Sequence, residues 1–195
     1  MLKILSGVNI KYKMENNKYD DAMFGFTIGF IGILVTLLLT LILDYETLCN
    51  CFVAVFKHYK SNDTRVFVIH ELRDDSDSFI DFLRENVEER SFHISFNGLA
   101  FDGQVTNHIM ENHEQWGKGE VFARKIYDFA QKTIDLINNR NFPPYAPWDL
   151  KIPHIDVYKL NHWDNLAKRS SLKWIEYTMD WNNILDMPIE HDTEI

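Results

Sequence analysis

The chain has 195 residues, of which 46% are hydrophobic and 14% aromatic. It is therefore long and apolar enough to build a packed core, and it is not a disordered chain. The formal net charge of −9 argues against a protein that coats nucleic acid by bulk electrostatic attraction. It does not exclude every nucleic-acid protein, because a site made of carboxylates stays acidic until cations fill it. The two cysteines, Cys49 and Cys51, are too close for a good disulfide and too few for a zinc site.

An apolar run near the N-terminus has two alternative interpretations. Met23 to Leu43 contain no charged residue, which meets the ~20 residues that a membrane-spanning helix needs. The last part of the run, Leu37 to Leu43, is instead typical of a buried central strand that leads straight into Asp44. One segment cannot be both. With a strand, the chain divides into an N-terminal extension with an apolar segment, residues 1–38, and a domain over residues 39–195.

Downstream of Asp44, the apolar spacing alternates between the strand period and the helix period. Two β-rich runs around a short polar turn predict a hairpin, and amphipathic stretches predict helices. The predicted elements, in chain order, are strands at 51–59 and 64–72, a helix at 74–89 capped by Ser76 or Asp77, a strand at 92–96, helices from about 101 and at 120–138, a proline-rich loop at 142–148, a strand at 152–160, and a helix that opens at Ser170 or Ser171. This order predicts an α/β fold with a mixed sheet.

Three carboxylates follow predicted strands. Asp44 and Glu46 are separated by one residue, so on a strand both project from the same face and can reach one metal cluster. After the strand at 92–96, Asn97-Gly98 allows a sharp turn, and Asp102 then stands at the start of a helix. We expect this spacing to bring the carboxylates to one sheet edge, within about 4–8 Å of each other, the scale of a two-metal site. An ordinary turn, and an Asp that complements a helix dipole, are the alternatives.

Together, Asp44-Tyr-Glu46 and Asn97-Gly-Leu-Ala-Phe101-Asp102 resemble the first two exonuclease motifs of the DnaQ-like (ribonuclease-H-like) superfamily. The resemblance is to the proofreading domains of family B DNA polymerases and their phage relatives in particular. The stretches from Ile155 to Asn165 and from Ser170 to Trp174 also look like a region of phage-encoded members. The resemblance runs from about Leu39 to the C-terminus and implies a ribonuclease-H-like mixed sheet flanked by helices.

The chain departs from this family at the third motif. That motif supplies a final Asp, preceded four or five residues earlier by a Tyr or a His. Neither Tyr177 nor His191 is followed by an Asp at that spacing. We therefore expect a domain that is C-terminally incomplete: either the gene is split or truncated, or the missing helix comes from another polypeptide.

The resemblance implies a metal-dependent enzyme that hydrolyses phosphodiesters from a 3′ end, weakly or not at all by itself. Asp44, Glu46 and Asp102 would bind two Mg²⁺ or Mn²⁺ ions about 3.5–4 Å apart. Asp44 would bridge the ions, Glu46 would help to hold one and orient the attacking water, and Asp102 would hold the other.

Further residues are candidates for substrate contact. We assign Asn97 and Phe101 to this role, since an aromatic ring near a strand end can stack on a base. Packing in the core is the alternative interpretation of Phe101. Lys168, Arg169 and Lys173 form the densest basic spot of the chain, beside a helix start that can receive phosphate. A solvated helix face is the alternative interpretation of these cations.

Two classes of function stay open. The first is a cytoplasmic exonuclease of DNA replication, whose partners are a single-stranded 3′ end and a polymerase or a polypeptide carrying the third motif. The second is a single-pass membrane protein, anchored through residues 23–43, with a soluble binding domain and no catalysis. An uninterrupted helix from Met23 through Leu43 would favour the second, and a central strand over Leu39 to Leu43 favours the first.

Overall fold

The computed structural model describes residues 40–61, 63–161, 170–180 and 192–194. The chain divides into two compact units, Met1–Leu37 and Leu38–Ile195, and all of the described residues belong to the second. The structural description below therefore concerns that unit alone.

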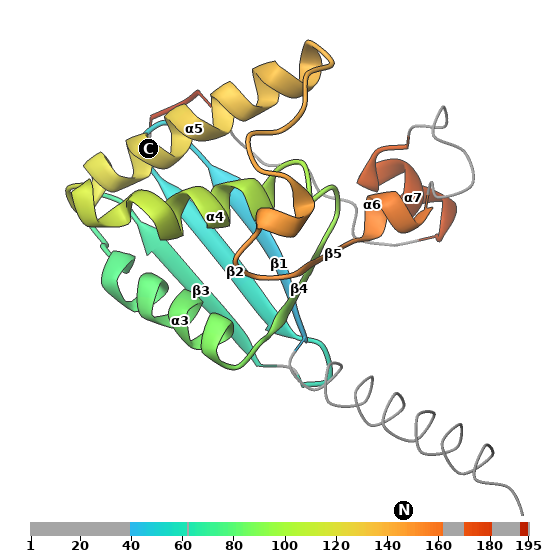
Figure 1. The fold of residues 1–195 in the computed structure, drawn as a ribbon, viewed down its shortest axis with the longest axis horizontal. Helices are drawn as coiled ribbons and strands as arrows, with labels where there is room; N and C mark the ends of the chain where they lie inside the picture. Colours follow the sequence, from blue (N-terminus) through green and yellow to red (C-terminus); the bar gives the residue numbers. More distant parts are fainter. Residues whose placement is uncertain (1–39, 62, 162–169, 181–191, 195) are drawn as a thin grey trace, which may run out of the picture. The chain divides into compact units, whose positions relative to one another are not determined.

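A five-stranded mixed sheet forms the centre of this unit (Figure 1). Its strands are β1 (Thr40–Thr47), β2 (Phe52–His58), β3 (Thr64–Ile69), β4 (Phe92–Ser95) and β5 (His154–Asp156). They lie in the order β3-β2-β1-β4-β5. The hairpin strand β2 is antiparallel to both β1 and β3, whereas β4 is parallel to both β1 and β5. The predicted α/β class with a mixed sheet is confirmed.

The described part of the apolar run forms a strand and not a helix. Residues 40–43 belong to β1, so Met23 to Leu43 do not form one uninterrupted helix, and the predicted central strand is confirmed. The apolar residues before position 40 lie outside the described residues. Within the part of the chain that the structure describes, no helix is long and apolar enough to cross a membrane.

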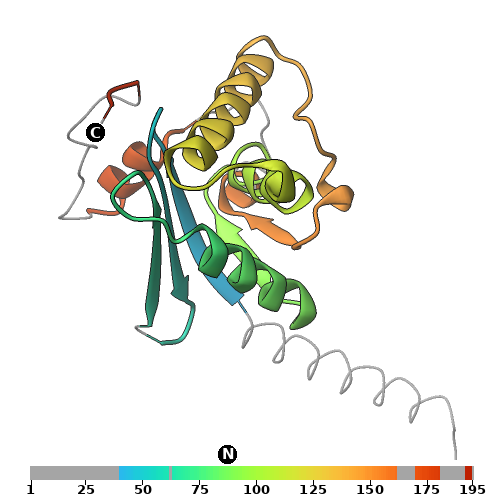
Figure 2. The same cartoon turned by 90° about the vertical axis from the view of Figure 1, so that its left-hand side faces the viewer.

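Three helices cover one face of the sheet: α3 (Ser76–Glu88), α4 (Asp102–Asn112) and α5 (Glu120–Asn138) (Figures 1 and 2). The bounds of α5 are those predicted from the sequence. The predicted cap of α3 is wrong. Its N-cap residue is Asp75, which makes no side-chain cap hydrogen bond. The Asp75 carboxylate instead accepts from the Val68 N–H at 2.9 Å and from Arg73 Nε at 2.8 Å, and so ties the helix start to β3.

The core lies between the sheet and these helices. Leu43 and Tyr45 of β1 are buried in it, and the Tyr45 hydroxyl hydrogen-bonds Thr106 Oγ1 of α4 at 2.8 Å. Five phenylalanine rings, contributed by β2, β3 and α3, pack beside Tyr45: Phe52, Phe56, Phe67, Phe79 and Phe82. Because successive strand residues point to opposite faces, Asp44 and Glu46 project from the face away from this core.

The predicted strand over 152–160 is wrong in its extent. β5 covers only His154–Asp156, and the short helix α6 (Val157–Asn161) follows at once. Asp156 causes the switch, because its Oδ1 accepts the N–H of Tyr158 at 2.9 Å and that of Lys159 at 3.4 Å. A carboxylate that satisfies the first N–H groups of a helix favours the helical turn over a continued strand.

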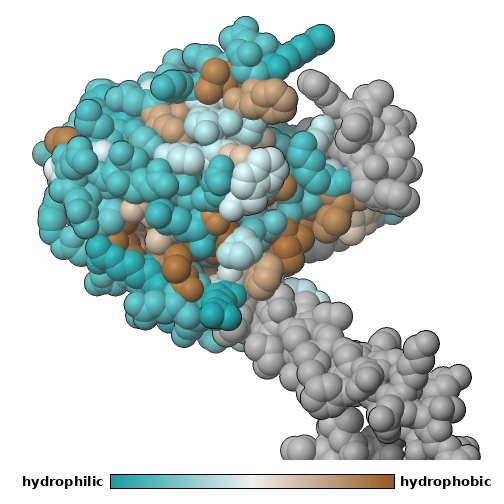
Figure 3. Space-filling model, in the orientation of Figure 1, coloured by the Kyte–Doolittle hydropathy of each residue, from teal (hydrophilic) through white to brown (hydrophobic). Residues whose placement is uncertain are grey.

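Short helices complete the fold. The 3₁₀ helix η2 (His113–Gln115) follows α4, and η3 (Pro147–Asp149) starts inside the predicted proline-rich loop. The last described helix, α7 (Leu172–Thr178), begins where the sequence predicts, with Ser171 Oγ accepting the Trp174 N–H at 3.2 Å. Figure 3 views the molecule from the helix side, where the surface is mostly hydrophilic with smaller hydrophobic patches.

Candidate functional site

The loop between β4 and α4 carries the second predicted motif and makes a sharp turn. Asn97 adopts a left-handed backbone conformation with φ 63°, which Asn tolerates better than most residues. At Gly98, an added Cβ would lie 1.9 Å from Ser95 Oγ and 2.3 Å from His154 Nε2. The turn thus needs a glycine for close approach, and it returns the chain to Asp102 directly above the end of β4.

Asp156 fixes this turn from the neighbouring strand. Its Oδ1 accepts the Asn97 N–H at 2.9 Å and its Oδ2 accepts the Leu99 N–H at 3.3 Å. Because the same carboxylate also accepts from the start of α6, its lone pairs are used by backbone donors. Asp156 is 4% exposed, and we assign it a structural role.

Asp102 is the first residue of α4, and its side chain is buried with 4% exposure. Burial raises the pKa of its carboxyl to about 7. A hydrogen bond from Ser95 opposes that rise, and the negative charges of Asp44 and Asp156 add to it. Asp102 is therefore close to half-protonated at neutral pH, and Asp44 lies within electrostatic reach of it.

Asp44 and Glu46 project from β1 on the same face, as the sequence predicts. The parallel pairing joins Ile42 to Ile94, so one further step brings Asp44 level with Phe96, just past the end of β4. The Asp44 side chain is exposed overall, yet desolvation of its carboxyl raises its pKa, partly offset by a hydrogen bond from the Tyr45 N–H. β1 thus extends beyond the last residue of β4, and we call the end of these two strands the corner of the sheet.

The carboxylates approach the corner from two sides. Asp102 begins α4, which covers the helix side of the sheet, whereas Asp44 and Glu46 start from the opposite face of β1. Among the described residues, no three His, Cys, Asp or Glu side chains are arranged to hold a metal ion. The two-metal site formed by Asp44, Glu46 and Asp102 therefore stays a prediction.

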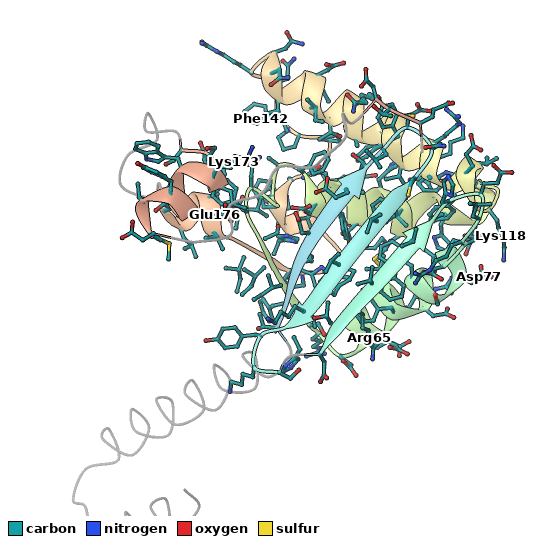
Figure 4. All side chains as sticks on the ribbon, turned by 180° about the vertical axis from the view of Figure 1, so that it is seen from behind. Arg65, Asp77, Lys118, Phe142, Lys173 and Glu176 are labelled. Atoms are coloured by element: carbon teal, nitrogen blue, oxygen red, sulfur yellow. The ribbon has the colours of Figure 1, made fainter. Side chains whose placement is uncertain are left out.

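The predicted substrate residues come from different parts of the fold. Asn97 and Phe101 lie on the turn, where Phe101 is half-buried and packs against the core. Lys173 is exposed on α7 and is labelled in Figure 4, which views the sheet from the side away from α3, α4 and α5. Lys168 and Arg169 lie outside the described residues. Substrate contact by these five residues stays a prediction.

Sequence reasoning missed two histidines on β4 and β5. His154 Nε2 lies 2.8 Å from Ser95 Oγ, and the His93 and His154 rings meet edge to face with centroids 5.9 Å apart. Burial lowers the pKa of His93 to about 3 and that of His154 to about 4, so both rings are neutral. Only the pairing of β4 with β5 brings them together, and neither has a local sequence signature.

Two hollows on the described surface lie elsewhere. One of about 290 Å³ is lined by β1, β2, β3 and α3, and includes Phe56 and Asn86. A second, of about 450 Å³, lies over β3 and α3. Neither is lined by Asp44, Glu46 or Asp102. The three carboxylates therefore do not belong to either of these hollows.

No protein-family model matches the chain, and no curated protein or solved structure matches it either. No family is therefore shown for the chain, and its resemblance to the DnaQ-like superfamily stays a prediction from the motifs.

Proposed function

We propose that this chain is a metal-dependent 3′–5′ exonuclease of the DnaQ-like class, which removes nucleotides from a single-stranded 3′ end. The observation that carries the proposal is the parallel pairing of β1 with β4, which brings Asp44 of the first motif level with the end of β4, where the turn of the second motif begins. A mixed sheet with β1 at its centre is compatible with the ribonuclease-H-like fold that the motifs imply.

The donor types at the corner suit Mg²⁺ or Mn²⁺, which prefer carboxylate oxygens. The negative charge of Asp44 makes ionisation of the buried Asp102 carboxyl harder, and a divalent cation nearby would reverse this effect. Metal binding should therefore release a proton from Asp102 near neutral pH.

Each carboxylate has a separate role in the proposal. When bound, two such ions supply an activated water and stabilise the leaving 3′ oxygen. Asp44 would contact both ions from β1. Glu46, on the same face, would hold one of them and orient the water, and Asp102 would hold the other from the start of α4.

Release of mononucleotides from a 3′-labelled single strand tests the proposal. We expect weak turnover that needs Mg²⁺ or Mn²⁺, stops with EDTA, and rises when a polypeptide with the third motif is added. Asp44→Ala should lower the rate by a factor on the order of 10² to 10³, the usual cost of one catalytic contact. Asp128→Ala, an exposed Asp on α5, is the matched control and should leave the rate unchanged. Full activity in Asp44→Ala would show that the site is wrong.

A further inference from the structure

The hollow of about 290 Å³ between α3 and the strands β1, β2 and β3 has an apolar wall. This wall is formed by Leu41, Phe56 and Phe82, and both phenylalanines belong to the buried core. Ligand sites begin at about 300 Å³ and are largely apolar, with a few polar groups that fix the orientation of the ligand. The hollow therefore suits a small ligand with a flat apolar body.

Asn86 of α3 also lines this hollow and contributes an unsatisfied donor. Its side chain is 3% exposed, and its Nδ2 has no hydrogen-bond partner among the described residues. A buried donor without a partner costs stability, so each such donor calls for an explanation. A half-turn of the amide about its last torsion exchanges Nδ2 and Oδ1, so the donor can face the hollow without movement of α3. A ligand with one acceptor atom would satisfy it.

The rim of the hollow is acidic. Asp63, Glu85 and Glu89 contribute three carboxylates, against one guanidinium from Arg65. All four side chains are exposed, and they leave an excess of two negative charges when His58 is counted as neutral. This sign disfavours a phosphate and favours a cation. The hollow is thus unsuited to the nucleic-acid strand of the proposed function and suited to an amine.

Arg65, labelled in Figure 4, shows how a cation sits at this rim. Its guanidinium carbon lies 4.9 Å from the centre of the Phe82 ring, and its Nη1 lies 3.8 Å from Glu85 Oε2. The face of an aromatic ring attracts an organic cation, and a carboxylate beside it adds to this attraction. The two side chains of the ion pair are 62% and 64% exposed, so the pair is weak. An amine from outside can therefore compete with Arg65 for Phe82 and Glu85.

We propose that this hollow binds a small heteroaromatic amine, and that it does so independently of the proposed exonuclease activity. The ring of the ligand packs against Phe56 and Phe82. Its acceptor atom accepts from Asn86 Nδ2, and its ammonium lies at the rim beside Glu85 and Glu89. The ring, the acceptor and the ammonium are thus each matched by a different part of the hollow.

Nitrogen-15 NMR titration of the full chain at pH 8 tests the proposal with three matched probes. 4-(Aminomethyl)pyridine carries the ring, the acceptor and the ammonium, whereas benzylamine lacks the acceptor and 4-methylpyridine lacks the ammonium. We expect 4-(aminomethyl)pyridine to shift the side-chain amide signals of Asn86. It should bind about 3- to 10-fold more tightly than benzylamine, which is the usual contribution of one hydrogen bond. 4-Methylpyridine should bind about 2- to 5-fold more weakly than 4-(aminomethyl)pyridine, because it forms no ion pair at the rim.

Variants assign each part of this preference to a side chain. Asn86→Leu should abolish the preference for 4-(aminomethyl)pyridine over benzylamine, and it should fold, because an apolar side chain of similar shape leaves no donor unpaired. Glu85→Gln should weaken both amines about 2- to 5-fold and leave 4-methylpyridine unchanged. Arg65→Gln removes the competing cation and should tighten the binding of both amines. Glu88→Gln is the matched control, because Glu88 is exposed on α3 and does not line the hollow, so the three affinities should change little.

Several outcomes would overturn the proposal. Equal affinity of the wild-type chain for 4-(aminomethyl)pyridine and benzylamine would show that the Asn86 donor is satisfied by another group, such as a buried water. A preference that survives in Asn86→Leu would place the acceptor contact elsewhere. Equal weakening in Glu85→Gln and Glu88→Gln would reduce the effect of charge to general attraction. Signals of the lining residues that do not move at millimolar probe would exclude the site itself, and none of these results bears on cleavage at a 3′ end.

Discussion

The helix-covered face of the sheet has two parts with different chemistry. Over β2 and β3 the buried side chains are mainly aromatic. The ring centroid of Phe56 lies 4.8 Å from that of Phe82 and 6.1 Å from that of Phe67. Over β4 and β5 the buried side chains are mostly polar, including His93, Ser95, Asp102, Gln104 and Asn107. One continuous sheet thus carries an apolar core beside a polar layer.

The polar layer is held by specific long-range bonds. Gln104 donates to the Leu99 and Tyr145 carbonyls at 2.8 and 2.9 Å and accepts the Tyr145 N–H at 2.7 Å. Asn107 Oδ1 accepts the Lys151 N–H at 2.9 Å. Apolar packing tolerates changes of shape, whereas a buried polar network specifies one geometry. The comparison teaches that β2, β3 and α3 supply stability, and that β4, β5 and α4 supply the fixed geometry around Asp102.

The largest expected loss of stability is in the apolar part. Phe56→Ala should lower the free energy of unfolding by about 3–5 kcal/mol, because it opens a cavity among packed rings. Phe142→Ala is the matched control: Phe142 is 92% exposed and should have little effect. Urea unfolding followed by fluorescence measures both. A loss below about 1 kcal/mol in Phe56→Ala would contradict the conclusion that the aromatic core over β2 and β3 supplies the stability.

In the polar layer, Asp102→Asn should instead stabilise the metal-free protein. Folding raises the pKa of Asp102 from 3.8 to about 7, so this carboxyl favours the folded state only at low pH, and that contribution is lost as pH rises through 7. The gain in Asp102→Asn should be near zero at pH 4 and reach at most roughly 4 kcal/mol above pH 7. Urea unfolding in EDTA at pH 4, 6 and 8 measures this difference. A gain in stability that does not change with pH would contradict the raised pKa of Asp102 in the folded protein.

Gly98→Ala tests the close approach in the polar layer. An added methyl would overlap Ser95 Oγ and His154 Nε2, and relieving the overlap should cost about 1–3 kcal/mol. Gly117→Ala is the comparison, because the nearest atom there is a Val121 side-chain carbon at 3.1 Å, which can move more easily. Thermal unfolding of the two variants should rank Gly98→Ala as the less stable. The reverse ranking would mean that the turn at Gly98 can shift without loss of stability.

The smallest expected effect concerns His93. Both of its ring nitrogens lack a hydrogen-bond partner among the described residues, and the ring is fully buried beside Phe56. His93→Phe removes these two unsatisfied groups and should stabilise the protein by about 1 kcal/mol at pH 7.5.

The gain in His93→Phe should grow toward pH 5. Folding lowers the pKa of His93 from 6.5 to about 3. The contribution of the neutral ring to the free energy of unfolding is therefore full above pH 6.5 and is lost as pH falls from 6.5 to about 3. Urea unfolding at pH 5 and 7.5 measures the trend, which is opposite to that of Asp102→Asn. Destabilisation at both pH values would indicate that the ring nitrogens have a partner, such as a buried water.

Local pattern predicted much of the fold. The hairpin of β2 and β3, the bounds of α5, the start of α7 and the strand that ends the apolar run all follow from residue spacing. The i and i+2 relation of Asp44 to Glu46 is also local. The predicted extent of β5 was wrong because the local apolar pattern does not indicate which groups the Asp156 carboxylate will contact.

What the sequence by itself determined is therefore most of the elements and the placement of Asp44 and Glu46 on one strand and of Asp102 at a helix start, because hydrophobic period and turn chemistry act between near neighbours. The tertiary structure alone decided that Asp156 is structural, and that Ser95 contacts His154. The contacts of Asp156 with the turn and of His154 with Ser95 join residues 57 to 59 positions apart. Such contacts depend on strand pairing and register, which set which side chains share a face and meet.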